Sequence, residues 1–295
     1  MKKKTTTPSK QTATQSRSPQ QKQATQRTKN YFVWGRRTVE SFLVKLQEKT
    51  SFDAQHYELH VIVDKTNKAP QQLKPAVELA KTLGIKLKTH LSEQSNWPLA
   101  DHEGVHHQRI CFMIPDYPFH DIEDALDCAK KATQDGEKGC IGLVLDQIQD
   151  PRNFGAILRS AAFFGVKFVV YGTDRQSEVT PLVLKTSAGG AFSLMLIPVV
   201  NINRALANLK EAGVWIVGSS LNEKTQALST LPKDRLFTLV VGNEEKGLRQ
   251  DVMKNCDYLV KIPGGANTVD SLNVSVATGV FLSHFERDTN GNSHT

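Results

Sequence analysis

Apolar and polar positions alternate along the second half of the chain in two rhythms. A strand is predicted at 141–146, because residues 141–145 are apolar in succession, which is typical of central strands in a parallel sheet. Residues 154–162 instead carry apolar side chains at helical spacing, and Gly165 stands where such a helix ends. Further strands are predicted at 166–171, 195–200, 214–217, 237–241 and 258–262, with helices at 202–209 and 273–287.

This alternation predicts an α/β fold in which helices cover both faces of a parallel sheet. The segment 273–287 is apolar on every side, so we expect that last helix to be buried.

A smaller α/β unit precedes this region. Its pattern predicts a short lead-in segment and helix over 31–47, a strand at 59–63, a helix at 73–83 and a strand at 109–114. The predicted organisation is a disordered basic tail (1–30), a first α/β domain (31–115), a linker containing a helix at 122–132 (116–138), a second α/β domain (139–288) and a flexible C-terminus (289–295).

The net charge of +7 is unevenly distributed. Eight of the 37 Lys and Arg residues lie in residues 1–30, which contain no Asp or Glu, so the remaining 29 basic residues are balanced by 30 acidic ones. The tail is rich in Thr, Gln, Ser and Lys and has little to bury, so it is expected to be disordered. It is either an arm that neutralises phosphates or a solubilising extension.

Several classes of protein are not favoured. The apolar runs are too short to span a bilayer, and no secretory signal is visible, so we expect neither a membrane nor a secreted protein. Cys111, Cys128, Cys140 and Cys256 match no zinc or redox spacing, which favours reduced thiols in a cytoplasmic protein.

Three loops that follow predicted strands carry unusual polar residues, at 150–159, 242–247 and 262–273. Ligands bind at the carboxyl ends of such strands, so these loops are the candidate site. Each has a simpler interpretation. Asn153 is placed to cap a helix, Arg159 could be a solvated side chain, and Ser271 with Asn273 could cap the last helix.

Together the loops resemble the three ordered motifs of SpoU/TrmH-type RNA 2′-O-methyltransferases, of the knotted SPOUT class. The matching residues are Asp150-Pro151-x-Asn153-x-Gly155-x-Ile157-x-Arg159, Gly242-x-Glu244-x-x-Gly247-Leu248, and Ile262-Pro263 followed by Ser271-Leu272-Asn273-Val274-Ser275. More weakly, Gly35-x-x-x-Val39-Glu40-x-x-Leu43 resembles the L30e-like substrate-binding domain of the rRNA-modifying branch.

The resemblance implies a deep trefoil knot in the second domain, a homodimer, and S-adenosylmethionine as cofactor. Carried over by position, Gly242, Ile262 and Leu272 contact the cofactor. The catalytic and ribose-facing set is Asn153, Arg159, Glu244, Ser271 and Asn273. The implied substrate is a guanosine of large-subunit (23S) rRNA, and no DNA partner is expected. A tRNA ribose methyltransferase, or a non-catalytic RNA-binding protein of this fold, is the alternative.

The reaction needs a weak nucleophile to lose a proton while it attacks the methyl carbon in line. Arginine is almost never deprotonated, so we expect Arg159 to stabilise the oxyanion or recruit a phosphate instead of acting as a base. His102-Glu103-Gly104-Val105-His106 also fits the H-E-x-x-H zinc pattern. Because that pattern binds zinc only on a helix and Gly104 interrupts it, no metal site is predicted.

Overall fold

The computed structural model describes residues 31–48, 52–92, 96–99, 106–115, 117–221, 225–232, 234–264 and 271–285. The predicted tail (1–30), the C-terminal segment (289–295), the loop 265–270 and most of the H-E-x-x-H pattern lie outside these residues.

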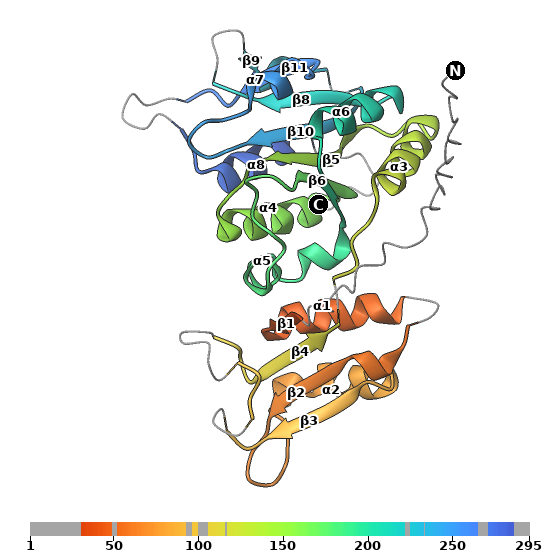
Figure 1. Cartoon of the computed structure of the whole chain (residues 1–295), viewed down its shortest axis with the longest axis vertical. Coiled ribbons are helices and arrows are strands. Elements are labelled where there is room, and N and C mark those ends of the chain that lie inside the picture. Colours follow the sequence, from red (N-terminus) through yellow and green to blue (C-terminus); the bar gives the residue numbers. More distant parts are fainter. Residues whose placement is uncertain are drawn as a thin grey trace, which may run out of the picture.

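The first unit is a four-stranded sheet with two helices. Its strands are β1 (Tyr31–Trp34), β2 (Glu58–Ile62), β3 (Lys86–His90) and β4 (Ile110–Ile114), in the order β1-β4-β2-β3. Strand β4 is antiparallel to both of its neighbours, whereas β2 and β3 are parallel. Helices α1 (Arg36–Gln47) and α2 (Lys74–Thr82) pack on this sheet and on each other (Figure 1). Short 3₁₀ turns lie at Ala54–His56 and Gln71–Leu73.

The second unit is a parallel sheet, as predicted. Its order is β7-β6-β5-β10-β8-β11-β9, and every described pairing is parallel. The strands are β5 (Gly139–Asp146), β6 (Phe168–Gly172), β7 (Met195–Val199), β8 (Trp215–Ser219), β9 (Gln226–Ala227), β10 (Leu236–Gly242) and β11 (Tyr258–Lys261).

Helices cover both faces of this sheet. Strand β5 shows the division, because Leu143 and Leu145 belong to one buried cluster while Ile141 and Val144 belong to another. The first cluster includes side chains of α4 (Pro151–Phe163), α5 (Pro181–Thr186) and α8 (Val274–His284). The second includes side chains of α3 (Ile122–Gln134), α6 (Ile202–Glu211) and α7 (Gln250–Met253). Further 3₁₀ turns lie at Gly190–Ser193 and Leu228–Thr230.

The helix expected in the linker packs on the second sheet. Helix α3 contributes Ala125, Ala129 and Ala132 to the cluster that also holds side chains of α6. Most of segment 116–138 therefore lies against the second sheet, whereas the sequence predicts a linker there. The domain boundaries themselves remain predictions.

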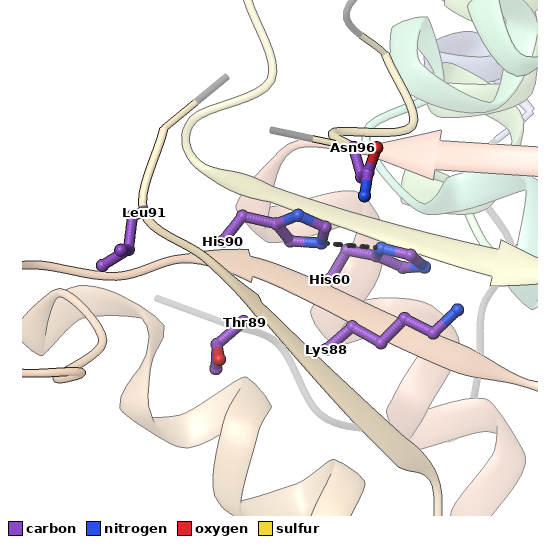
Figure 2. A pocket seen from close by; sticks show the side chains of 6 residues that line it. All are labelled: His60, Lys88, Thr89, His90, Leu91 and Asn96. Atoms are coloured by element: carbon purple, nitrogen blue, oxygen red, sulfur yellow. Dashed lines mark hydrogen bonds between the residues drawn. The ribbon is translucent and has the colours of Figure 1, made fainter. Parts of the chain in front are cut away.

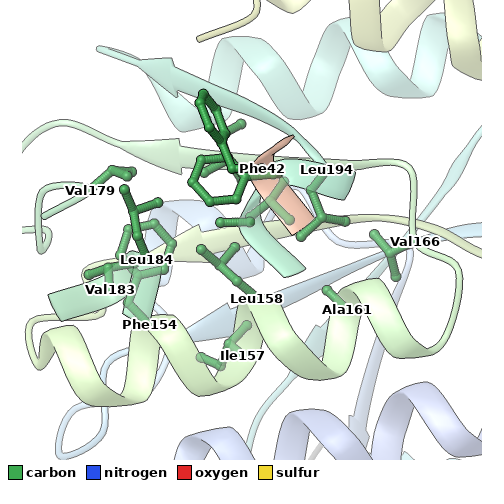
Figure 3. Packing of buried hydrophobic residues seen from close by; sticks show 14 of the residues in the cluster. Phe42, Phe154, Ile157, Leu158, Ala161, Val166, Val179, Val183, Leu184 and Leu194 are labelled. Atoms are coloured by element: carbon green, nitrogen blue, oxygen red, sulfur yellow. The ribbon is translucent and has the colours of Figure 1, made fainter. Parts of the chain in front are cut away.

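Packed aromatic side chains, called the aromatic joint below, connect the two units. Phe42 of α1 lies 4.4 Å, centroid to centroid, from Phe192 in the turn Gly190–Ser193. The buried hydroxyl of Tyr117 donates a hydrogen bond of 2.6 Å to the carbonyl of Ala191. Figure 3 shows Phe42 among the side chains of α4 and α5, so one hydrophobic cluster spans both units.

One face of the last helix is exposed, which corrects the expectation that it is buried. Val274, Phe281 and Leu282 are buried, but Val276 and Val280 are exposed, as is Leu272 just before the helix. Among the residues that the structure describes, only one flank of α8 is covered.

Candidate active site

The three predicted loops meet at one end of the parallel sheet. The first follows β5, the second follows β10, which pairs with β5, and the third follows β11. Because parallel strands end at the same edge, residues more than 100 positions apart become neighbours here.

A chain of hydrogen bonds joins one predicted catalytic residue from each loop. Asn273 donates from Nδ2 to Oδ1 of Asn153 at 3.1 Å, and Asn153 donates from Nδ2 to Oε1 of Glu244 at 3.0 Å. Asn273 also caps α8 through a bond from the backbone N–H of Ser275 at 2.9 Å. Asn273 therefore caps α8 and also orients Asn153, while its catalytic role stays a prediction.

Asn153 does not cap α4, contrary to the simpler interpretation of this residue. The helix begins at Pro151, and Asp150 is the capping residue, accepting 2.8 Å from the backbone N–H of Arg152. Proline is favoured at the first helical position, which moves the cap to the residue before it. The side chain of Asn153 is thereby free to bridge Glu244 and Asn273.

A cavity of about 690 Å³ lies beside this chain. All three residues predicted to contact the cofactor line it, as do Glu244 and Ser271. Its apolar wall is formed by Leu248, Val260, Ile262, Leu272 and Phe281. Ligand sites for small molecules commonly enclose 300–1,000 Å³ with mostly apolar walls and a few polar groups, which this cavity matches.

The loop after β10 explains why residue 242 is glycine. Asn243 and Gly247 exchange backbone hydrogen bonds of 3.1 and 2.9 Å, which fold the loop back on itself. A Cβ on Gly242 would lie 2.4 Å from backbone atoms of Gly247 and Leu248. A side chain is therefore excluded by the loop itself, in addition to any role for Gly242 as a cavity wall.

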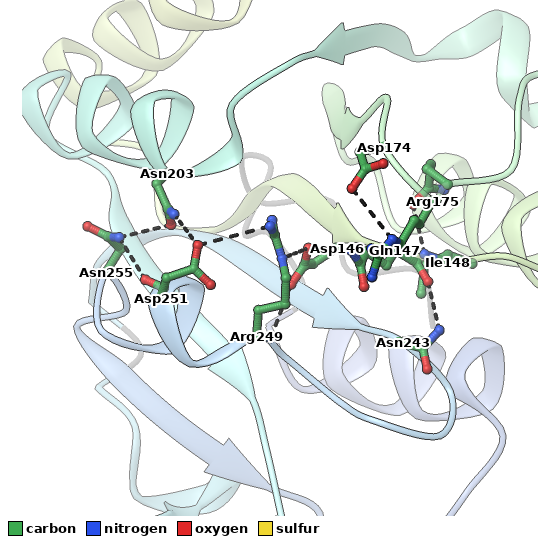
Figure 4. A network of polar contacts seen from close by, with 11 residues as sticks. Asp146, Gln147, Ile148, Asp174, Arg175, Asn203, Asn243, Arg249, Asp251 and Asn255 are labelled. Carbon is green, nitrogen blue, oxygen red and sulfur yellow. Dashed lines mark hydrogen bonds and ion pairs between the residues drawn. The ribbon is translucent and has the colours of Figure 1, made fainter.

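Sequence reasoning missed the residues that anchor this loop to β5. Asp146, at the end of β5, is fully buried and accepts 2.8 Å from Nε of Arg249 and 3.2 Å from its backbone N–H. Asn243 donates 2.9 Å to the carbonyl of Gln147. Figure 4 shows both anchors, and the pair continues through Asp251 to Asn203 and Asn255. No local motif signals a pair separated by 103 positions.

Burial and the ion pair with Arg249 shift the pKa of Asp146 in opposite directions. Burial raises the pKa of its carboxyl and is the larger effect, while hydrogen bonds and charge from Arg249 lower it, so the net shift is upward. The loop is therefore held by a carboxylate that depends on Arg249 to remain charged.

Arg159 lies apart from the cavity. It is exposed on α4, and the structure gives its guanidinium no hydrogen bond or ion pair with the described residues. It is available to a ligand that approaches from solvent.

Neither a metal cluster nor a membrane span is found in the part of the chain that the structure describes. No three His, Cys, Asp or Glu side chains there are grouped to hold a metal ion. No described helix is long and apolar enough to cross a bilayer. All four cysteines are free.

Comparison with known proteins agrees with the motifs. Residues 141–283 match the model of the SpoU rRNA Methylase family. A 23S rRNA (guanosine-2′-O-)-methyltransferase RlmB of Coxiella burnetii is 36% identical over 225 residues, covering 75% of this chain and 84% of the relative. The RlmB of Xylella fastidiosa is 40% identical over 182 residues, covering 61% of this chain and 70% of that relative.

Solved structures agree on the fold. An AdoMet-bound rRNA methyltransferase from Sinorhizobium meliloti superposes with a TM-score of 0.66 at 18% identity, covering 87% of each chain. The SpoU methyltransferase AviRb from Streptomyces viridochromogenes gives 0.65 at 19% identity, covering 86% of this chain and 88% of that one. The family model over residues 141–283 and the identity to relatives over most of their length show that the chain belongs to the SpoU rRNA methylase family.

Proposed function

We propose that this protein transfers a methyl group from S-adenosylmethionine to the ribose 2′-hydroxyl of a guanosine in 23S rRNA. The observation that carries the proposal is the hydrogen-bonded chain Asn273–Asn153–Glu244 at the rim of the 690 Å³ cavity. It joins three of the five residues that the family's motifs predict to be catalytic or to face the ribose. The relatives that carry the name RlmB support the choice of guanosine and of 23S rRNA.

The cavity fits the cofactor. Its apolar wall suits a nucleoside base and a methionine chain, and Ser219, Ser220 and backbone groups of the loops offer polar partners. Gly242, Ile262 and Leu272 would hold the cofactor there. When bound, it supplies an activated methyl group on a sulfonium, which leaves easily.

The protein's own side chains orient the ribose and handle the proton. Each oxygen of Glu244 accepts an amide N–H, Oε1 from Asn153 at 3.0 Å and Oε2 from Asn243 at 3.4 Å, so the carboxylate is fixed at the cavity wall. A fixed carboxylate within hydrogen-bond reach of a hydroxyl can take its proton. We assign this role to Glu244. Arg159, which stays charged, binds the RNA phosphate or the developing oxyanion.

The experiment is a methyl-transfer assay with the full chain, labelled S-adenosylmethionine and 23S rRNA fragments. Arg159→Ala should abolish turnover while calorimetry shows cofactor affinity unchanged. Glu244→Gln should lower kcat by about 10²- to 10⁴-fold, as removal of a general base does. Glu211→Gln, an exposed Glu on α6 away from the cavity, is the matched control and should behave as wild type.

Three results would overturn the proposal. Methylation of tRNA instead of rRNA would favour the alternative substrate. Cofactor binding without transfer to any RNA would favour a non-catalytic RNA-binding protein. Near-normal turnover of Arg159→Ala would remove Arg159 from the mechanism.

The first unit is proposed to be the substrate-binding domain. A cavity on its sheet is lined by His60, Lys88, Thr89, His90, Leu91 and Asn96 (Figure 2). The side chain of Lys88 is 40% exposed, and that of Lys86, two residues earlier on the same strand, is 63% exposed, although Glu58 pairs with both. Exposed lysines of this kind contact phosphates, so Lys88→Ala should raise the KM for RNA and leave kcat unchanged.

The active form is proposed to be a cytoplasmic homodimer joined through α8. Leu272, Val276 and Val280 recur every fourth residue and are 48%, 53% and 40% exposed, and Phe163 of the adjoining α4 is 82% exposed. Contiguous exposed apolar side chains mark interaction surfaces. A second copy of this chain would bury the flank of α8 that the described residues leave exposed.

A further inference from the structure

A second cavity, separate from the cofactor cavity, opens at the start of α4. It measures about 360 Å³ and is lined by Gln147, Gln149, Asp150, Asn153, Arg175, Asn243, Glu244, Glu245 and Lys246. The loop 243–246 lines both cavities and forms the wall between them. A ligand in the second cavity therefore lies across this loop from the proposed cofactor.

The two cavities differ in chemistry. The wall of the cofactor cavity contains Leu248, Val260, Ile262 and Phe281, whereas every residue that lines the second cavity carries an amide or a charge. A wholly polar cavity suits a ligand with many donors and acceptors around its edge, as a nucleobase has.

Some of these polar groups are already engaged. Asn153, Asn243 and Glu244 bond to one another and to Gln147, and Asp150 caps α4. Other lining side chains, including those of Arg175, Gln149 and Lys246, have no hydrogen bond with a described residue. Arg175 makes only a long ion pair, with its Nε 3.9 Å from Asp174. Its donors are therefore available to a ligand.

The backbone of the cavity wall is held in a costly conformation. Arg175 and Gln147, neither of them glycine, have φ values of 51° and 64°. The left-handed region is unfavourable for a residue with a Cβ. Strain of this kind is concentrated where a side chain must be aimed at a ligand.

We infer that the second cavity binds the base of the target guanosine, with the Arg175 guanidinium donating to O6 and N7 of that base. This inference rests on the proposed function and adds the recognition of the nucleotide. With the base in this cavity, the ribose lies at the shared wall, which Glu244 forms and to which Asn153 is bonded from the side of the second cavity. Arginine matches O6 and N7 of guanine with two parallel N–H bonds, whereas adenine presents a donor in place of O6. Lys246 is a point charge and lacks this geometry.

The test removes one acceptor atom from the RNA. Synthetic rRNA fragments carry guanosine, 7-deazaguanosine or adenosine at the methylated position, and kcat/KM is measured for each. Wild type should lose about 2- to 12-fold on 7-deazaguanosine, because one of the two hydrogen bonds of the bidentate pair is missing. Arg175→Ala should lose about 5- to 150-fold on guanosine and should no longer distinguish guanosine from 7-deazaguanosine.

Two further measurements keep the inference falsifiable. Arg175 is 70% exposed, so its removal should leave the fold and the calorimetric affinity for S-adenosylmethionine unchanged. Arg204→Ala, an exposed Arg on α6 outside both cavities, controls for the loss of a positive charge and should keep the wild-type preference.

Each outcome bears on a different claim. If wild type methylates guanosine but treats 7-deazaguanosine equally, or if Arg175→Ala keeps the wild-type sensitivity, the inference is wrong while the proposed function stands. If Lys246→Ala abolishes the sensitivity and Arg175→Ala does not, the base is read by another residue. If wild type methylates none of these RNAs, the proposed function fails and the inference fails with it.

Discussion

Removing Arg249 should destabilise the protein more than neutralising its partner Asp146. The two residues anchor a loop to the end of β5. This loop lies between the proposed cofactor cavity and the proposed base cavity. Their exposures differ sharply, since the side chain of Asp146 is 0% exposed and that of Arg249 is 41% exposed. The cost of each substitution depends on which partner is left behind.

The magnitudes follow from that difference. Arg249→Ala leaves a buried carboxylate with one backbone N–H at 3.2 Å, so we expect a loss of about 3 kcal/mol, at the lower end for broken buried pairs. Asp146→Asn leaves a guanidinium that can turn toward water, so we expect about 1–1.5 kcal/mol, the worth of one hydrogen bond.

The pH dependence of the free energy of unfolding provides a second test of the same ion pair. Burial raises the pKa of Asp146, so the folded state binds its proton more tightly than the unfolded state does. The stability linked to this group is therefore present at low pH and lost as pH rises through the folded pKa. Removing Arg249 raises that pKa further, so the deficit of Arg249→Ala relative to wild type should shrink from about pH 7 to about pH 5.

The assay is urea unfolding of wild type and both variants at each pH, with the KM for S-adenosylmethionine measured in parallel. We expect the KM to rise in both variants, because the loop lines the cofactor cavity. Equal losses for the two variants, or a deficit for Arg249→Ala that grows as the pH falls, would refute the reasoning.

Three further predictions concern the loop, the helix face and the joint between the units. Gly242→Ala should abolish cofactor binding in calorimetry, because its Cβ would meet loop backbone at 2.4 Å; normal affinity would show that the loop can rearrange. Val276→Glu should yield a folded monomer in light scattering, because it charges the exposed face of α8; a persistent dimer would place the interface elsewhere. Phe42→Ala should lower the free energy of unfolding by about 3–5 kcal/mol, since Phe42 is 3% exposed against Phe192; a loss under about 1 kcal/mol would mean that the joint does not couple the units.

The parts of the fold that the sequence predicted well are those where burial decides the conformation. Strands β5 and β10 are buried at every position, and their apolar runs located them to within about two residues. Strand β3 escaped prediction, because Lys86–His90 is an edge strand in which only His90 is buried. Edge strands need few apolar residues, so hydropathy gives little signal there.

Some parts of the candidate site could be predicted from the sequence and others could not. The loops that carry Asn153, Glu244 and Asn273 could be found because each follows a recognisable strand, and their meeting follows from the parallel order. The Asp146–Arg249 anchor and the cavity around Arg175 could not be found, because each joins residues from distant segments without a local pattern. Such contacts depend on which strands lie side by side in the sheet. The order of the strands cannot be predicted from the local spacing of residues.

The exposed face of α8 is a second place where the sequence-based prediction and the structure differ, and this difference bears on function. A helix that is apolar all round predicts burial, and that prediction was wrong for Val276 and Val280 within a single chain. The free-energy cost of exposing these apolar side chains to water is avoided if a second copy of the chain covers them. Asn273, which caps this same helix, also begins the hydrogen-bonded chain to Glu244. A dimer contact on α8 would therefore steady the residue that orients Asn153, and a monomeric Val276→Glu should lose kcat as well as its partner.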